Sequence, residues 1–317
     1  MADEEKRALL VGDNPFHGIS HLSQERDRER GNMFTYPENA ANLVITSVKN
    51  GANGFMFSVS DTTLSILKVI CEKKEIKQLS LYAIVPYAYE YVRLANQVGG
   101  VTGLIRKIAK KIIMSGDLKA TVQGLKGGLK ADPVSLMKTY LTYEISRIKS
   151  SVGKQANIHS VLLHQAITDM ALAFELDWLF KSYISFMVNL GIVPGFNSGN
   201  FAYLVNKFNE WNIDLSKILI AAPFNKVGFQ MNPSKMECER ALEIIPEPTV
   251  IAISILAAGY LKPSEAIEYI ATLPNIKGVA IGVSKEKHAR ETFRVLRENL
   301  QLGKHFKSTT DIGRKRW

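Results

Sequence analysis

Three histidines stand where they could do chemistry. His164 directly follows the apolar run Val161–Leu163, and His17 and His21 are four residues apart. A histidine can donate a hydrogen bond to a substrate oxygen or move a proton near neutral pH. One helical turn would also bring His17 and His21 onto one face, where they could chelate a divalent metal with Asp13 or His164. Metal binding is the less favoured hypothesis, because no acidic cluster accompanies them.

Asp61 is the third catalytic candidate, beside His164 and His17. It could act as a general acid or base. It could instead cap a helix that begins at Thr62, since an N-cap aspartate accepts backbone hydrogen bonds. The cap is the favoured interpretation.

Further polar residues follow other short apolar runs. A ligand could be oriented by such groups where several loops converge. We expect the substrate to contact Asp13, Asn14, Gln165 and Asn225. Ser284 and Lys285 supply a hydroxyl and a cation at the start of a predicted helix, where unpaired backbone N–H groups favour a phosphate. The candidate cofactor-binding residues are Asn197, Ser198, Ser254, Gly282, Ser284 and Lys285.

Eight short apolar runs must position these residues. They alternate with longer helical patterns, which is typical of parallel βα architecture. The expected strands are 8–11, 54–59, 79–85, 161–163, 192–193, 218–220, 250–253 and 279–281. Helices are expected at 37–49, 62–74, 171–190, 201–211, 235–245, 263–273 and 285–300. Eight units predict an α/β fold of the (β/α)8 TIM-barrel type, whose active site lies after the strands.

The chain is expected to be one domain, 1–317, with two additions. Residues 87–155 are far longer than one crossover helix requires, so we predict a helical insertion between strands three and four, with Asp132-Pro133 opening its last helix. The basic tail, 304–317, lacks periodicity and is expected to be a solvated, disordered end. The turn Gly12-Asp13-Asn14-Pro15 is not the GxGxxG of a Rossmann fold, which argues against an open sheet.

Composition narrows the classes of function. The 317 residues are 46% hydrophobic and carry a net charge of +10, concentrated in 106–154 and in the tail. This distribution makes nucleic acid an unlikely partner, while a small phosphorylated ligand fits it. The charged start, Met1–Arg7, and the lack of a long apolar run predict neither export nor a membrane span. Two cysteines without a metal or redox motif fit a cytoplasmic protein.

The carboxyl-terminal half resembles the aldo-keto reductases. The resemblance rests on 252–261, on 278–291 (GVAIGVSKEKHARE), on Val161–His164, on Gly195-Phe196-Asn197-Ser198 and on Pro223-Phe224-Asn225, and it spans about 157–300. It implies a TIM barrel, an active-site His164, a loosely matched Asp61, and NAD(P)H-dependent carbonyl reduction. The family's tyrosine and lysine are missing: no tyrosine follows Asp61 at its spacing, and Val85-Pro86 stands where the lysine is expected. Tyr87, Tyr89 or Tyr91 could substitute for that tyrosine.

The leading hypothesis is thus a divergent aldo-keto reductase-like enzyme that binds NAD(P) and a small carbonyl compound. A lyase, aldolase or metal-assisted hydrolase could use Asp13, His17, His21 and His164 on the same barrel. A non-catalytic protein could bind an acidic partner or RNA through 106–154.

Overall fold

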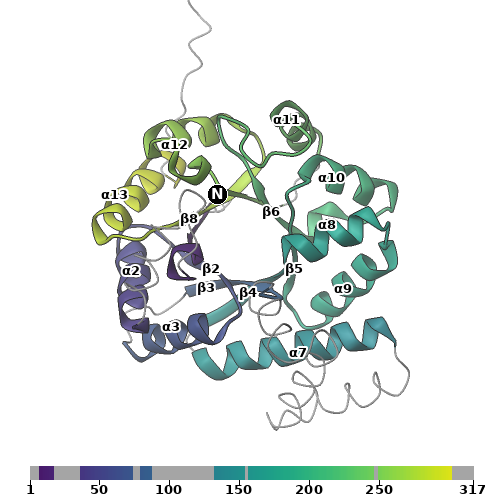
Figure 1. The fold of residues 1–317 in the computed structure, drawn as a ribbon, viewed down its shortest axis with the longest axis horizontal. Helices are drawn as coiled ribbons and strands as arrows, with labels where there is room; N and C mark the ends of the chain where they lie inside the picture. The colour runs from purple at the N-terminus through teal and green to yellow at the C-terminus, as the bar shows by residue number, and fades with distance from the viewer. Residues whose placement is uncertain are drawn as a thin grey trace, which may run out of the picture.

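Eight parallel strands close into a barrel in chain order, with β8 paired to β1 (Figure 1). The computed structural model describes residues 7–17, 36–73, 79–87, 132–153, 156–245 and 249–301. The strands are β1 (Ala8–Gly12), β2 (Gly54–Ser58), β3 (Leu79–Val85), β4 (Ala156–Leu163), β5 (Val193–Asn197), β6 (Leu219–Pro223), β7 (Thr249–Ile253) and β8 (Ile276–Gly282). The predicted (β/α)8 fold is confirmed.

Both faces of the strands are buried. Successive side chains of a strand point to opposite faces, so alternate residues fill the barrel interior and the layer beneath the helices. The interior cluster includes Leu10, Met56, Tyr82, Leu162 and Leu219. Their neighbours along the chain belong to the larger outer cluster. This alternation determines which residue at each strand end faces the barrel axis.

Helices surround the barrel. They are α2 (Pro37–Lys49), α3 (Asp61–Glu72), α7 (Pro133–Val152), α8 (Gln165–Ala173), α9 (Asp177–Asn189), α10 (Phe201–Glu210), α11 (Lys235–Ile244), α12 (Pro263–Thr272) and α13 (Glu286–Leu296), with short turns η1 (Asn14–His17), η2 (Leu215–Lys217), η3 (Ala257–Gly259) and η4 (Arg297–Gln301). In α10, Phe201, Leu204, Val205 and Phe208 are all buried. Residues spaced three and four apart lie on one side of a helix, and this apolar side packs the helix against the core.

The single helix predicted over 171–190 is wrong. The chain forms α8 and α9 with a corner between them, where Glu175 has a left-handed backbone (φ 53°). The N–H groups of Glu175 and Leu176 bond to carbonyls at the end of α8 and close that helix. No glycine or proline marks the corner, so the helical period continues through it in the sequence.

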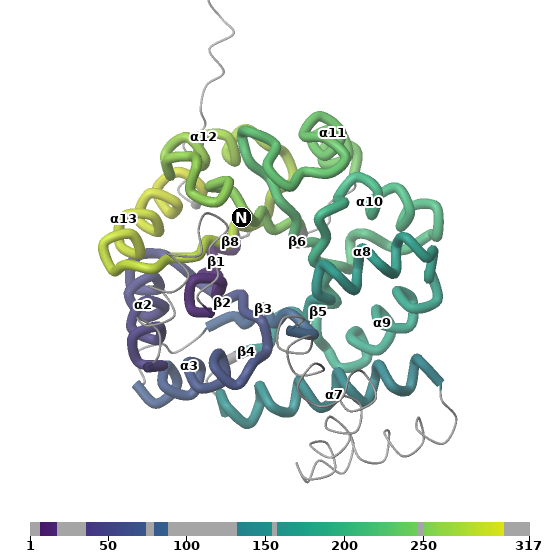
Figure 2. The backbone as a smooth tube through the Cα atoms, in the orientation of Figure 1, coloured from purple at the N-terminus to yellow at the C-terminus, as the bar shows by residue number. Residues whose placement is uncertain are grey.

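The last part of the predicted insertion is a helix, as expected from Asp132-Pro133. The Asp132 carboxylate accepts hydrogen bonds from the N–H groups of Val134 and Ser135 and caps α7. The helix lies along one edge of the barrel, beside α3 and α9 (Figure 2). Residues 88–131 and the tail 304–317 lie outside the described residues. Within the described part of the chain, no helix is both long and apolar enough to cross a bilayer.

Candidate functional site

The carboxyl-terminal ends of the strands form the barrel mouth, where the predicted site residues gather. The outward neighbours Phe57, Leu163 and Phe196 belong to the outer core. The next residues, Ser58, His164 and Asn197, therefore face the barrel axis. His164 continues the ladder of β4, because its N–H donates to the carbonyl of Val85 at 2.7 Å.

Asp13 and His17 form a direct pair at the end of β1. The His17 Nε2 atom lies 3.0 Å from Asp13 Oδ2, and the side chains are 6% and 5% exposed. The same carboxylate oxygen accepts a hydrogen bond of 2.7 Å from the N–H of Ser58, which ties β1 to the end of β2. The Tyr87 ring lies against that of His17, with centroids 4.8 Å apart. Groups from the ends of β1, β2 and β3 therefore meet at the Asp13–His17 pair.

His164 is the N-cap of α8. Its Nδ1 accepts a hydrogen bond of 3.1 Å from the N–H of Ala166, which requires this nitrogen to be unprotonated. The neutral ring consequently carries its proton on Nε2. Burial lowers the pKa of His164, and the charge of Asp169 partly opposes this effect. His164 is thus held as a neutral donor at the mouth.

Asp169 is a half-buried carboxylate that the sequence analysis missed. Its Oδ1 accepts a hydrogen bond of 2.6 Å from Ser198 Oγ, and its Oδ2 one of 3.2 Å from the N–H of Gly199. The side chains of Asn200 and Gln165 also donate to it. Burial raises its pKa, and these hydrogen bonds oppose the rise. The sequence signal was its place four residues after Gln165 on α8, where side chains meet.

Asn197 carries an unused acceptor. Among the described residues, its Oδ1 is the one buried side-chain oxygen or nitrogen without a hydrogen-bond partner. Such an atom costs free energy unless a water or a ligand satisfies it. An N–H donor would satisfy this oxygen.

Two predicted ligand contacts serve the loops instead. Ser198 is fully buried, donates to Asp169, and accepts a hydrogen bond from the N–H of Asn200 at 3.0 Å. Asn225 is also fully buried, and its amide bonds the N–H and the carbonyl of Phe229, both at 2.8 Å. Neither side chain presents a free polar group to the mouth.

Asp61 is not the cap of α3. Ser60 occupies that position, since Ser60 Oγ accepts a hydrogen bond from the N–H of Thr63 and the Thr63 hydroxyl accepts one from the N–H of Ser60. Asp61 is the first helical residue, with its side chain 76% exposed, and it pairs with Arg147 of α7 at 2.5 Å. The structure pairs this carboxylate with the outer helices rather than with His164 or His17.

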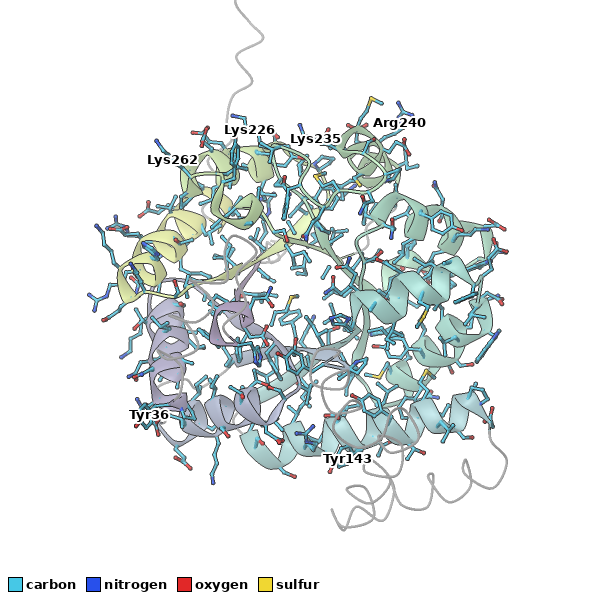
Figure 3. All side chains as sticks on the ribbon, in the orientation of Figure 1. Tyr36, Tyr143, Lys226, Lys235, Arg240 and Lys262 are labelled. Atoms are coloured by element: carbon cyan, nitrogen blue, oxygen red, sulfur yellow. The ribbon has the colours of Figure 1, made fainter. Side chains whose placement is uncertain are left out.

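The loops after β6 and β7 have an unusual backbone. Gln230 and Ser254 both have positive φ, at 60° and 53°, and their side chains meet at 3.3 Å. Ala257 and Ala258 also have positive φ. Non-glycine residues in this conformation store strain, which occurs preferentially at functional sites. Lys226 and Lys262, which follow these strands, lie on the outer edge of the molecule rather than over the barrel centre (Figure 3).

The last strand leads into α13. A Cβ atom on Gly282 would lie 2.7 Å from Pro15 in η1, so only glycine permits this close approach. The N-cap residue of α13 is Lys285, whose side chain makes no capping bond. The backbone N–H groups of the first turn are thus left to another acceptor, beside Ser284 and Lys285. Asn14 is exposed in η1.

The described residues contain no group of three or more histidine, cysteine, aspartate or glutamate side chains that could hold a metal. His21 lies outside the described residues, so the proposed His17–His21 pair stays a prediction.

Comparisons with known proteins support the fold. No protein-family model and no curated protein matched the sequence. Two solved structures from Pseudomonas aeruginosa, each described as a “putative aldo-keto reductase”, are similar, with TM-scores of 0.55 and 0.54. Each is 10% identical to this chain, and each comparison covers 93% of this chain and 91% of the other. At this identity the likeness concerns the fold alone, which is the closed barrel of eight parallel strands.

Proposed function

We propose that this protein is an NAD(P)-linked oxidoreductase that acts on the carbonyl group of a small molecule, as aldo-keto reductases do. The proposal rests on the protonation state of His164. With Nδ1 engaged by Ala166 and its pKa lowered by burial, the ring is a neutral Nε2–H donor in the mouth. Such a donor can hold a carbonyl oxygen and stabilise the negative charge that develops on it.

The residues at the mouth fit a nicotinamide cofactor at two points. The unpaired Asn197 Oδ1 would accept a hydrogen bond from the ring carboxamide. Ser284, Lys285 and the first-turn N–H groups of α13 would hold a phosphate, since a helix N-terminus favours anions. When bound, the cofactor would supply or accept a hydride.

The Asp13–His17 pair would transfer a proton to the substrate oxygen. A protonated His17, with Nε2 bonded to Asp13, would donate from Nδ1 to the substrate oxygen, and the carboxylate would stabilise the imidazolium. Tyr87, against the His17 ring, would help to orient it. This pair would replace the tyrosine and lysine that the sequence lacks. Asn14 and Gln165 stay candidates for substrate contacts, and Ser254 for a cofactor contact.

The proposal is tested by thermal shift with NADH, NADPH and FMN. A ligand that binds the folded protein at 100 times its Kd stabilises it by about 2.7 kcal/mol, so NADH or NADPH should raise the Tm. Asn197→Ala and Lys285→Ala should reduce the rise. Asn209→Ala and Lys287→Ala, at exposed positions on α10 and α13, are the matched controls. An unchanged Tm with both nicotinamide cofactors would contradict the proposal.

A lyase or aldolase is the second candidate, because Asp13–His17 and His164 provide two groups for proton transfer. It needs no nicotinamide, so turnover without any effect of NADH or NADPH on Tm would favour it. Elemental analysis of the purified protein would test the metal-assisted version.

A further inference from the structure

We propose that Asp169 is a positioning residue: its carboxylate holds the β5 loop that carries Asn197 and acts electrostatically on His164. The effect of Asp169 on NADPH binding rests on the proposed function, whereas its contacts with the β5 loop do not depend on a cofactor.

Asp169 makes specific hydrogen bonds to the loop after β5. Both carboxylate oxygens are engaged, Oδ1 by the Ser198 hydroxyl and Oδ2 by the N–H of Gly199. Ser198 directly follows Asn197, and its N–H also donates to the carbonyl of Ala221 in β6. The residues after Asn197 are thereby held from two sides. Such support would matter for an amide that binds a ligand, because a displacement of about 1 Å can lower a rate about 100-fold.

The network extends to the next loop. The carbonyl of Gly199 accepts hydrogen bonds from the backbone and the side-chain amide of Asn232, at 3.3 and 3.2 Å. The Gln165 side chain also lies close to Gly199, with its Nε2 2.4 Å from the position that a Cβ atom on Gly199 would take. Asp169 therefore belongs to a hydrogen-bond network that joins α8, the loop after β5 and the loop after β6.

The same carboxylate acts on His164. Among the described residues, Asp169 is the charged group that opposes the lowering of the His164 pKa by burial. An ionised Asp169 favours the protonated ring electrostatically. Asp169 would thus set both the geometry of Asn197 and the charge balance of His164.

The test separates these two effects by NMR on the ligand-free protein. In Asp169→Asn, whose side chain keeps the volume of aspartate, the titration midpoint of His164 should fall and the side-chain amide signal of Asn197 should shift. Ser198→Ala should shift the Asn197 signal but leave the His164 midpoint at the wild-type value. Asp177→Asn, an exposed carboxylate that pairs with Lys181 on α9, is the control and should change neither.

Binding of NADPH gives a third measurement. Asp169→Asn should weaken it severalfold, and Asp177→Asn should not. If wild-type protein does not bind NADPH, the proposed function fails, while the two NMR signals still decide the role of Asp169. Wild-type values for both His164 and Asn197 in the Asp169→Asn variant would overturn the positioning role.

Discussion

Two histidines follow strands at the barrel mouth, and the carboxylates that act on them are arranged differently. Asp13 contacts His17 directly and also bonds the backbone of β2. Asp169 influences His164 only electrostatically, and its oxygens are used by the loop after β5. Direct contact fixes the orientation and tautomer of one ring. The indirect arrangement leaves the Nε2–H of the other histidine available and uses its carboxylate to organise neighbouring loops.

This difference suggests that the two histidines have different roles. His17 has a buried anion beside it that can stabilise a positive ring, which suits proton transfer. His164 is held neutral by its cap bond and by burial, which suits hydrogen-bond donation. Two histidines with distinct environments can therefore take distinct roles in one site.

The largest expected effect is on stability, in Asp13→Ala. This change removes a buried acceptor from the N–H of Ser58 and from His17. Leaving buried partners unpaired should cost about 3 kcal/mol. Urea unfolding measures the loss, with Asp177→Ala, at an exposed pair, expected to cost less than about 1 kcal/mol. Equal losses in the two variants would mean that the Asp13 contacts contribute no more than a surface pair.

A comparable effect is expected on turnover. His17→Gln and His164→Gln should each lower kcat about 100-fold, which is typical of losing a group that transfers or holds a proton. His159→Gln is the matched control, because this half-buried histidine of β4 lies against Tyr82 within the barrel. Steady-state kinetics with the identified cofactor measures the effect. A large loss of kcat in only one of the two variants would contradict the proposal that both histidines act in the reaction.

A smaller effect is expected in the pH dependence of stability. Burial lowers the pKa of His164 below the ordinary 6.5, so the unfolded chain takes up its proton at higher pH than the folded protein. Stability from this residue should fall as the pH drops through about 6.5 toward the folded-state pKa. Protonation also removes the acceptor of the Ala166 N–H.

His164→Gln should therefore flatten the loss of stability between pH 7 and 5. Chemical unfolding at a series of pH values measures it, with His288→Gln, exposed on α13, as the control. The same slope in wild type and His164→Gln would show that His164 is not held in its neutral form.

The smallest effect is expected for Asp61→Asn. Its carboxylate is mostly exposed and pairs with Arg147, and exposed ion pairs contribute about 0.2 to 1 kcal/mol. Urea unfolding should show a loss within that range, and kcat should stay at the wild-type value. A large fall in kcat would place Asp61 in the site and extend the comparison to a third carboxylate.

The sequence by itself determined the barrel and which polar residues follow its strands. Strand and helix periods are local properties, and eight repeats of them leave few alternatives to a closed barrel. The positions of His17, His164 and Asn197 follow from strand ends in the same way. The cap of α7 at Asp132 is also encoded within a few residues.

Only the tertiary structure decided how these groups are used. Asp61 meets Arg147, 86 residues away, and Asp169 meets Ser198, 29 residues away. Such contacts depend on how separate loops and helices are placed around the barrel, which no local period specifies. The same holds for Ser198, whose hydroxyl bonds Asp169 of α8, and for Asn197, whose buried oxygen has no partner among the described residues. Spacing predicts which side chains reach the mouth, whereas packing decides which of them keep a free polar atom there.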